Sequence, residues 1–83
     1  MRLRFTKSFE GEYKKITKGN TALDKKIRKQ LSLIQDDINH PSLRLHKVGS
    51  YWSISVDKSI RILIAIEAQW IAIYHVGKHE DMY

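Results

Sequence analysis

The chain has 83 residues and a formal net charge of +6, which suits one small domain, residues 1–83, and excludes a second. Its 15 Lys and Arg outnumber its nine Asp and Glu, a balance that favours nucleic acid or ribosomal RNA as a partner over a merely soluble basic domain. Cysteine is absent and no apolar run approaches the ~18 residues of a membrane span, so disulfides, thiolate metal sites and membrane insertion are excluded and a cytoplasmic location is expected.

The first half of the chain predicts one strand and two helices. Residues 2–5 alternate charged and apolar side chains, as a short strand does. Gly19-Asn20 separates the two helices, and Thr21 with Asp24 resembles a capping box that starts the second. Apolar residues at helical spacing mark the two buried faces: Phe9, Tyr13 and Ile16 in the first helix, and Leu23, Ile27, Leu31, Ile34 and Ile38 in the second.

Positive charge gathers on the second helix, opposite its apolar stripe. Lys25 and Lys29 belong to this group and could bind the phosphates of a nucleic acid. A solvated helix face explains the same pattern equally well.

The second half of the chain predicts three consecutive antiparallel strands. After a connector over residues 42–50, alternation marks strands at residues 51–56, 60–67 and 70–75, joined by short turns. The order β, α, α, β, β, β corresponds to an α+β fold in which two N-terminal helices pack on one face of a small, twisted antiparallel sheet. The other face of the sheet then stays open.

The open face is where we expect the chemistry. Alternation turns the isoleucines of the middle meander strand toward the helices and Arg61 away from them. The connector brings His46 and Lys47 to the rim, and the C-terminal tail brings His79 and Tyr83. The expected lining of this basic concavity is Tyr51, Ser53, Ser55 and Arg61.

Three of these side chains form a set that can cleave RNA without a metal. The reaction needs a base for the 2′-OH, a cation for the phosphate and an acid for the leaving 5′ oxygen. His46 and His79 can each serve as base or acid near neutral pH. Arg61 stays charged and can hold a phosphate bidentately.

Other residues are candidates for binding the substrate. Lys47 would add charge beside the scissile phosphate, and Tyr51 or Tyr83 could stack on a splayed base. Each candidate also has an ordinary explanation. A strand arginine is commonly ion-paired, a histidine near a turn is commonly a polar surface residue, and a strand tyrosine commonly packs at a core or an edge.

A metal site is the weaker alternative for the C-terminal cluster. His75 and His79 would need a helix to share a metal ion, and Gly77 disfavours a helix there. We therefore expect neither a metal nor a cofactor.

With these residues in place, the sequence resembles the RelE/ParE superfamily of small basic toxins from toxin–antitoxin pairs, in particular its YafQ-like and RelE-like ribonucleases. The resemblance spans nearly the whole chain. It rests on the element order and on three segments, which are PSLRLHKV at residues 41–48, SIRI at residues 59–62 and GKHEDMY at residues 77–83.

This resemblance implies a function and a set of partners. Such toxins are metal-independent endoribonucleases that enter the ribosomal A site and cut mRNA through attack of the 2′-OH, leaving a 2′,3′-cyclic phosphate. The implied partners are mRNA on the ribosome, ribosomal RNA and a cognate antitoxin that blocks the toxin. By position, the implied catalytic residues are His46, Arg61, His79 and Tyr83.

Departures from the family pattern leave alternatives open. YafQ-like members carry further His and Asp residues on the middle strands, where this chain has Ser53, Ser55 and Asp57, so base and acid stay unassigned. ParE-like members share the fold and inhibit DNA gyrase without an acid/base pair, and a catalytically inactive RNA-binding relative is a third possibility.

Overall fold

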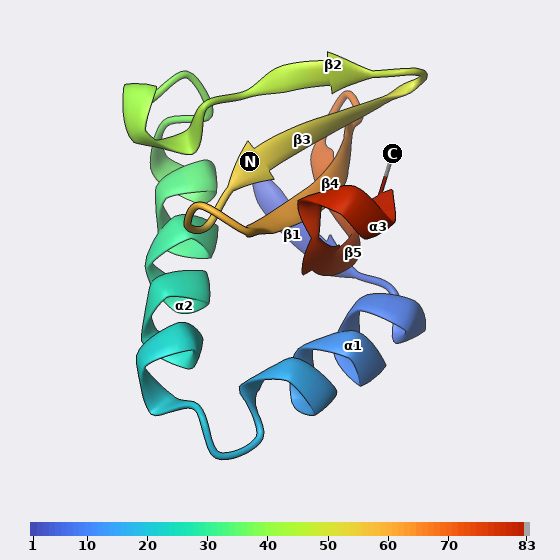
Figure 1. Ribbon diagram of the computed structural model, residues 1–83. Helices are drawn as coiled ribbons and strands as arrows, with labels where there is room; N and C mark the ends of the chain where they lie inside the picture. Colours follow the sequence, from blue (N-terminus) through green and yellow to red (C-terminus); the bar gives the residue numbers. More distant parts are fainter. Residues whose placement is uncertain (83) are drawn as a thin grey trace.

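Two helices cover one face of a twisted sheet of five strands (Figure 1). The computed structural model describes the backbone of residues 1–82 and the side chains of residues 1–80. Its elements in chain order are β1 (Arg2–Phe5), α1 (Lys7–Thr17), α2 (Thr21–Asp36), the 3-10 helix η1 (Pro41–Leu43), β2 (His46–Val48), β3 (Tyr51–Ser55), β4 (Ile60–Ile66), β5 (Trp70–Lys78) and α3 (His79–Met82). Within this described part, no helix has both the length and the apolar character that crossing a bilayer demands.

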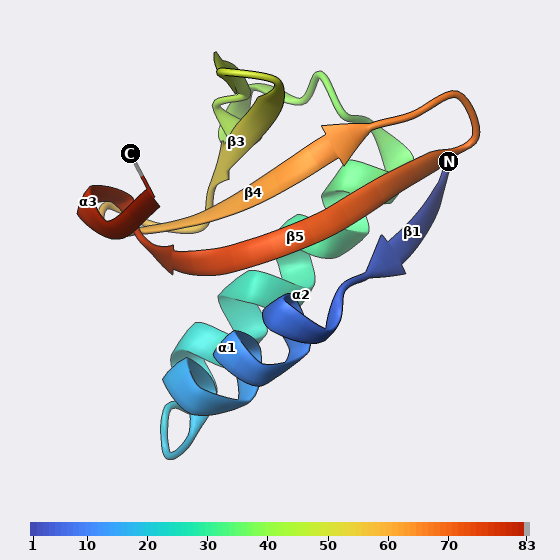
Figure 2. The same cartoon turned by 90° about the vertical axis from the view of Figure 1, so that its right-hand side faces the viewer.

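The sheet is mixed, which corrects the purely antiparallel sheet predicted from the sequence. Its strand order is β1-β5-β4-β3-β2, and β1 pairs with β5 in parallel while the other pairs are antiparallel. Figure 2 shows β1 beside β5 at the edge of the sheet, where Leu3 is the register partner of Ile71. This pairing joins opposite ends of the chain, and the local alternation of each strand carries no information about such a distant partner.

A further strand, β2, lies within the segment predicted as a connector. His46 in β2 pairs with Ser53 in β3. Because β2 has only three residues, two of them charged or polar, it lacks an alternation long enough to identify. The predicted C-terminal tail also differs: β5 continues to Lys78, and α3 begins at His79.

The turn between α1 and α2 confirms one predicted feature and corrects another. Gly19 has a φ of +71°, a left-handed conformation that costs other residues about 1–2 kcal/mol, so a break was correctly expected there. Asn20, and not the predicted Thr21, is the N-cap of α2, because its Oδ1 accepts the backbone N–H of Leu23 at 3.1 Å.

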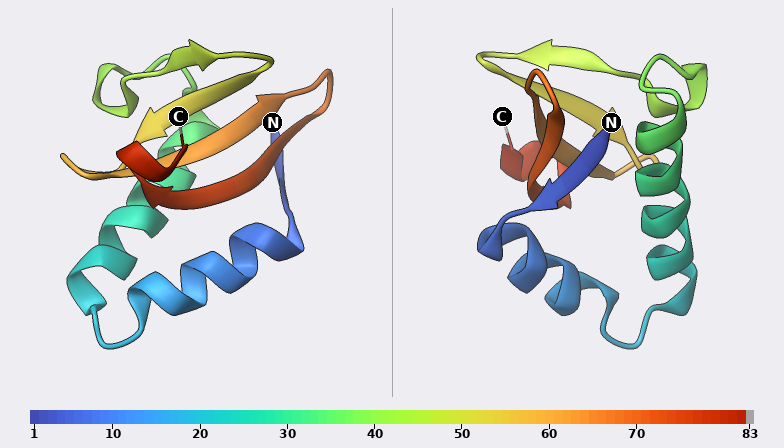
Figure 3. Two further views of the ribbon diagram at one scale, coloured as in Figure 1. Left: turned by 45° about the vertical axis from the view of Figure 1, so that its right-hand side comes forward. Right: turned by 180° about the vertical axis from the view of Figure 1, so that it is seen from behind.

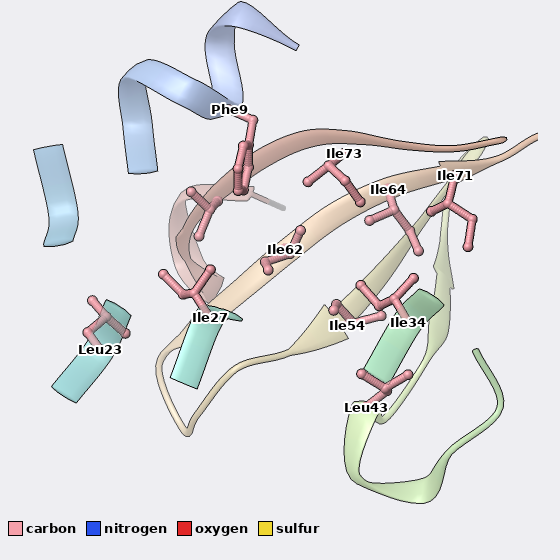
Figure 4. Packing of buried hydrophobic residues seen from close by; sticks show 11 residues of the cluster. Phe9, Leu23, Ile27, Ile34, Leu43, Ile54, Ile62, Ile64, Ile71 and Ile73 are labelled. Carbon is pink, nitrogen blue, oxygen red and sulfur yellow. The ribbon is translucent and has the colours of Figure 1, made fainter. Parts of the chain in front are cut away.

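The core lies between the helices and the sheet, and isoleucine dominates it (Figure 4). Ile27 and Ile34 of α2 and Ile62 and Ile64 of β4 are at most 1% exposed, and burying one such side chain contributes about 1.5–3 kcal/mol. The predicted inward alternation of β4 is confirmed at its centre. A one-residue slip of β4 would turn these isoleucines to solvent, so the core fixes the face on which Arg61 lies.

A buried glutamine connects α2 to the segments around the open face. Gln30 is 6% exposed, and its Nε2 donates to the carbonyl of Ser55 in β3 at 2.7 Å and to that of Ser42 in η1 at 3.3 Å. Immediately after η1, Arg44 adopts a left-handed conformation with φ 47° and ψ 51°. Gln30 therefore holds η1 against β3, directly before the left-handed turn at Arg44.

A hydrogen bond between Tyr13 of α1 and Asp24 of α2 joins the two helices, and Arg28 of α2 shares the same carboxylate. The Tyr13 hydroxyl donates to the Asp24 carboxylate, and Arg28 Nε donates to the same carboxylate at 3.0 Å. The hydrogen bond from Tyr13 lowers the pKa of Asp24 below its ordinary value, and burial raises the pKa of Tyr13. We call this set the interhelix clasp.

Candidate active site on the open sheet face

Three neighbouring strands bring His46, Ser53 and Arg61 together on the face that α1 and α2 leave uncovered. In the ladders, His46 is opposite Ser53 and Arg61 is opposite Ser55, and opposite residues in antiparallel strands point to the same face. Figure 3 shows β2, β3 and β4 running side by side. The site therefore arises from the same alternation that sends Ile54 and Ile62 into the core.

Arg61 is held in place by acceptors from three segments that surround its guanidinium. Nε donates to Ser53 Oγ at 2.5 Å. Nη2 donates to the Arg44 carbonyl at 3.0 Å and lies 3.3 Å from His46 Nδ1. Arg61 is only 8% exposed, and such burial of a charge requires partners of this kind.

One nitrogen of the guanidinium remains for a ligand. Nη1 makes no hydrogen bond to a described residue, and no buried polar side-chain atom in that part of the chain lacks a partner, so Nη1 reaches the surface. Arg61 thus presents the two N–H groups of Nη1 to the surface. Nε and Nη2, which would complete the bidentate grip on phosphate expected from the sequence, are bonded within the protein.

Two tyrosines form an aromatic pair on the open face. The rings of Tyr51 and Tyr74 meet edge to face, with centroids 5.2 Å apart and planes at 67°, across the intervening strand β4. Tyr74 is the extra residue of a β-bulge, because Leu63 is opposite His75 while Ile64 is opposite Ile73. Tyr51 is 37% exposed, so the pair presents aromatic surface to solvent.

The predicted substrate-binding lysines lie apart from Arg61. Lys47 is opposite Trp52 in the ladder, and its Nζ lies 4.9 Å from the Trp52 ring centre, on the other face of the sheet from His46. Lys25 and Lys29 are exposed on α2, turned away from the residues that face the sheet. The structure therefore groups His46 with Arg61 and separates these lysines from them.

His79 lies near the end of the strand pair that carries Arg61. It follows Gly77, the register partner of Arg61, by two residues, and its backbone N–H donates to the Ser59 carbonyl at 2.8 Å. A hollow of about 360 Å³ there is lined by Lys58, Ser59, Lys78, His79 and Glu80. Tyr83, predicted to act with His79, lies outside the described residues.

Another hollow, of about 800 Å³, lies between α1 and β5. His75 Nδ1 lies 3.2 Å from both carboxylate oxygens of Glu12, which also accepts the backbone N–H of Val76 at 3.2 Å. Glu12 thereby pairs with the part of the β5 edge that β1 leaves open. Among the described residues, no three His, Asp or Glu side chains are close enough together to hold a metal ion.

Sequence reasoning proposed His46 and Arg61, which the structure brings into contact, but it did not foresee the other groups around Arg61. The Arg44 carbonyl gives no signal in the sequence, since any residue has one. Ser53 was expected as part of an exposed lining, but the structure buries it completely against Arg61. Tyr74 was interpreted as a core or edge aromatic, because the bulge that turns it to the open face depends on pairing with β4.

Known proteins resemble this chain in fold but not in sequence. No family model matches the sequence, and no curated protein sequence gives a significant match. Solved structures do match. YafQ from E. coli aligns over 100% of this chain and 99% of its own, with a TM-score of 0.83 and 11% identity.

Two further solved structures share this fold. The E. coli DinJ–YafQ toxin–antitoxin complex contains a chain that aligns over 98% of this one and 94% of its own, with a TM-score of 0.82 and 10% identity. A YoeB/ParE toxin from Agrobacterium tumefaciens aligns over 95% of this chain and 99% of its own, with a TM-score of 0.81 and 14% identity. The chain therefore has the fold of these YafQ and YoeB/ParE toxin structures, which is the fold that the sequence resemblance implied.

Proposed function

We propose that this protein is the toxin of a toxin–antitoxin pair and that it cleaves mRNA on the ribosome, in the cytoplasm, through attack of a 2′-OH on the adjacent phosphate. The observation that carries the proposal is the nearly buried Arg61 guanidinium, held 3.3 Å from His46 on a sheet face that the two large helices leave uncovered. The toxins among the structures that share the fold support the toxin role.

The chemistry assigns a task to each group. A base removes the 2′ proton, the 2′ oxygen bonds to phosphorus, the bond from phosphorus to the 5′ oxygen breaks, and that oxygen takes up a proton. Arg61 Nη1 would bind a non-bridging phosphate oxygen as negative charge develops on it. His46 and His79 supply the two imidazoles that would serve as the base and the acid.

The aromatic pair of Tyr51 and Tyr74 would bind an unstacked base next to the scissile phosphate. Single-stranded RNA is commonly recognised by stacking on such rings, because every base offers a π face. By its resemblance to the family, Tyr83, at the end of the segment over residues 77–83, would also stack on a base.

The remaining partner is a cognate antitoxin. DinJ and YafQ form a toxin–antitoxin complex, and a chain with a net charge of +6 suits an acidic inhibitor. We expect such a protein to be encoded next to this one and to suppress its toxicity when the two are produced together.

Replacing Arg61 tests the proposal directly. On induction in a bacterial host, the wild-type protein is expected to stop growth and to leave codon-registered cuts in mRNA, mapped by primer extension. Arg61→Ala should lower cleavage about 10²–10³-fold, the loss typical of removing one donor to a developing oxyanion. Arg4→Ala removes an exposed arginine that is paired with Glu67 on the sheet edge and should cleave normally.

Two outcomes would contradict this assignment. Equal cleavage by wild type and Arg61→Ala would remove Arg61 from the site. Intact mRNA together with gyrase-linked DNA damage would replace the nuclease by the ParE-like inhibitor. Because Arg61 is buried, circular dichroism and thermal melting of the variant must first show a folded protein, and Arg61→Lys provides a second variant that keeps the charge but loses the planar fork.

A further inference from the structure

A polar side chain interrupts the buried face of α2. The buried residues of this helix are at most 9% exposed, and Gln30, at 6%, is the polar one among Leu23, Ile27, Gln30 and Ile34. Burying an amide costs free energy unless its groups find hydrogen-bond partners, and an apolar side chain of similar length fills such a position without that cost. The amide of Gln30 therefore does something that filling the core does not require.

The partners of Gln30 are two main-chain carbonyls from different segments. Its Nε2 donates to the Ser55 carbonyl in β3 at 2.7 Å and to the Ser42 carbonyl in η1 at 3.3 Å. An amide nitrogen has two N–H groups, so one side chain can bond both carbonyls at once. Gln30 thus ties η1 to β3 from the helix side of the sheet.

Both carbonyls belong to segments that adjoin the Arg61 guanidinium. Ser55 is the register partner of Arg61 in the ladder of β3 and β4. Ser42 precedes Arg44 by two residues, and the Arg44 carbonyl accepts Arg61 Nη2 at 3.0 Å. The bridge made by Gln30 therefore holds the segment that carries this acceptor against the strand pair that carries the donor.

Arg44 depends on such support because its own backbone conformation is unfavourable. Its φ of 47° and ψ of 51° lie in the left-handed region, where a residue with a Cβ is strained. A residue keeps such a conformation only where its surroundings impose it. Here the N–H of Arg44 donates to the Pro41 carbonyl at 3.2 Å. Leu43, directly before it, is completely buried, and Gln30 bonds Ser42, one residue earlier.

We propose that Gln30 is a positioning residue for Arg61. It acts from the opposite face of the sheet, by keeping the Arg44 carbonyl where Arg61 Nη2 can donate to it, so that Nη1 is presented to the substrate in one orientation. Gln30 itself touches no substrate. The proposal rests on the proposed nuclease function, in which Arg61 binds the scissile phosphate, and it leaves the base and the acid as assigned there.

Nuclear magnetic resonance of the arginine side chains tests the proposal without any measure of activity. Rotation about the Nε–Cζ bond of a guanidinium exchanges Nη1 with Nη2, and a fixed acceptor on Nη2 slows that rotation. In the wild-type protein with ¹⁵N-labelled arginine, Arg61 should therefore give two separate Nη signals, identified by their loss in Arg61→Lys. Gln30→Met keeps the length of the side chain and removes its N–H donors. Exchange between the two signals should then become about 10-fold faster, a factor that corresponds to most of one hydrogen bond to a charged group.

Ile27→Val is the matched control for a loosened core. Ile27 lies on the same buried face three residues before Gln30, is completely buried, and is well apart from Leu43 of η1 in Figure 4. Urea unfolding measures how far each variant is destabilised. Exchange at Arg61 should keep the wild-type rate in Ile27→Val, because η1 keeps its bridge to β3. A wild-type rate in folded Gln30→Met, or equally raised rates in both variants, would overturn the proposal.

A second variant covers the case in which Gln30→Met does not fold. Gln30→Asn keeps an amide in the core but is one methylene shorter, so it reaches at most one of the two carbonyls that Gln30 bridges. Faster exchange at Arg61 is expected here too. An unchanged rate in this variant would likewise count against the positioning role.

The kinetics of the folded variants separate positioning from substrate binding. A contact that gains strength only as charge develops on the phosphate affects kcat and leaves KM nearly unchanged. Gln30→Met should lower kcat on ribosome-bound mRNA about 10-fold with KM within about 2-fold of wild type, while Ile27→Val keeps both. An unchanged kcat in a variant whose Arg61 signals exchange faster would refute the positioning role. Absence of cleavage by the wild-type protein would instead overturn the nuclease function, and the Arg61 signals do not depend on that outcome.

Discussion

Tyr51 and Tyr74 are the residues on the open face that the structure brings together from strands that are not neighbours. Their edge-to-face contact spans β4, and it exists because the bulge in β5 supplies Tyr74 as an extra residue. Aromatic pairs of this geometry contribute about 0.5–1.5 kcal/mol beyond the burial of their area. The pair therefore has a role in stability as well as a proposed role in binding RNA, and the two must be separated by experiment.

Replacing Tyr74 separates them. Tyr74→Ala removes half of the aromatic surface, and since stacking is worth about 1–3 kcal/mol per base, kcat/KM for ribosome-bound mRNA should fall about 10–100-fold. Tyr74→Phe keeps the ring and should retain the activity. A comparable loss in both variants would indicate that the hydroxyl matters and stacking does not. Urea unfolding of each variant measures the share of the loss that comes from stability.

At this scale, the sequence identifies side chains but not their partners. The alternation of β4 correctly predicts that Arg61 lies opposite the isoleucine face, because a period of two is a local property of a strand. The acceptors of Arg61 come from β2, β3 and the turn after η1, and no local pattern brings those three together. The burial of Ser53 and the location of Lys47 on the other face follow from the same non-local pairing.

Among the elements, α1 and α2 are joined by the interhelix clasp of Tyr13, Asp24 and Arg28. The clasp places a carboxylate between two donors, one phenolic and one cationic. Arg28 is four residues after Asp24 on α2 and is itself largely exposed, so the contact that crosses between helices is the one from Tyr13. Removing its hydroxyl should loosen the pair of helices without touching the open face.

The stability of the clasp should depend on pH at both ends of the scale. The pKa of Asp24 is lowered from 3.8, so its contribution is present above that value and disappears as acid protonates the folded carboxyl. The pKa of Tyr13 is raised from 10.0, so its contribution is present below that value and disappears as base ionises the folded phenol. The stability difference between wild type and Tyr13→Phe should therefore be level from about pH 5 to pH 9 and shrink on both sides.

Urea unfolding across this range measures the difference. Tyr51→Phe is a suitable control, because it removes a phenolic hydroxyl far from Asp24, and its stability difference from wild type should not follow the acid limb. A Tyr13→Phe difference that stayed constant down to pH 3 would show that Asp24 is not the partner that matters.

The elements also differ in how well the sequence reveals them. The apolar stripe of α2 covers several turns and predicts the helix with its buried Ile27 and Ile34, as the structure confirms. β1 and β2 have four and three residues, and each becomes a strand by adding to an edge that the rest of the chain provides. Short edge strands depend on a partner more than on their own residues, so β2 was missed and the direction of β1 was not foreseen.

For the whole molecule, positive charge is spread well beyond the candidate site. The open face carries Arg61, while the helical side carries Lys25 and Lys29 on the outer surface of α2, with the core and the sheet between them. A ribosome presents RNA on more than one side of a small protein bound in a cleft. In the proposed function, we expect the lysines of α2 to attach the protein to ribosomal RNA, separately from the chemistry.

The double variant Lys25→Gln/Lys29→Gln tests this division of roles. Each lost phosphate contact should weaken binding to ribosomes and lower the salt dependence of the affinity by about 0.7–0.9 in slope, while kcat on saturating ribosomes stays unchanged because neither lysine reaches the open face. Lys14→Gln/Lys18→Gln is the matched control, since it removes two exposed charges from α1 and the turn after it. Binding that weakens equally in both double variants would assign the effect to net charge alone. A lowered kcat in the α2 variant would mean that these lysines act in the reaction, against their location on the far side of the sheet.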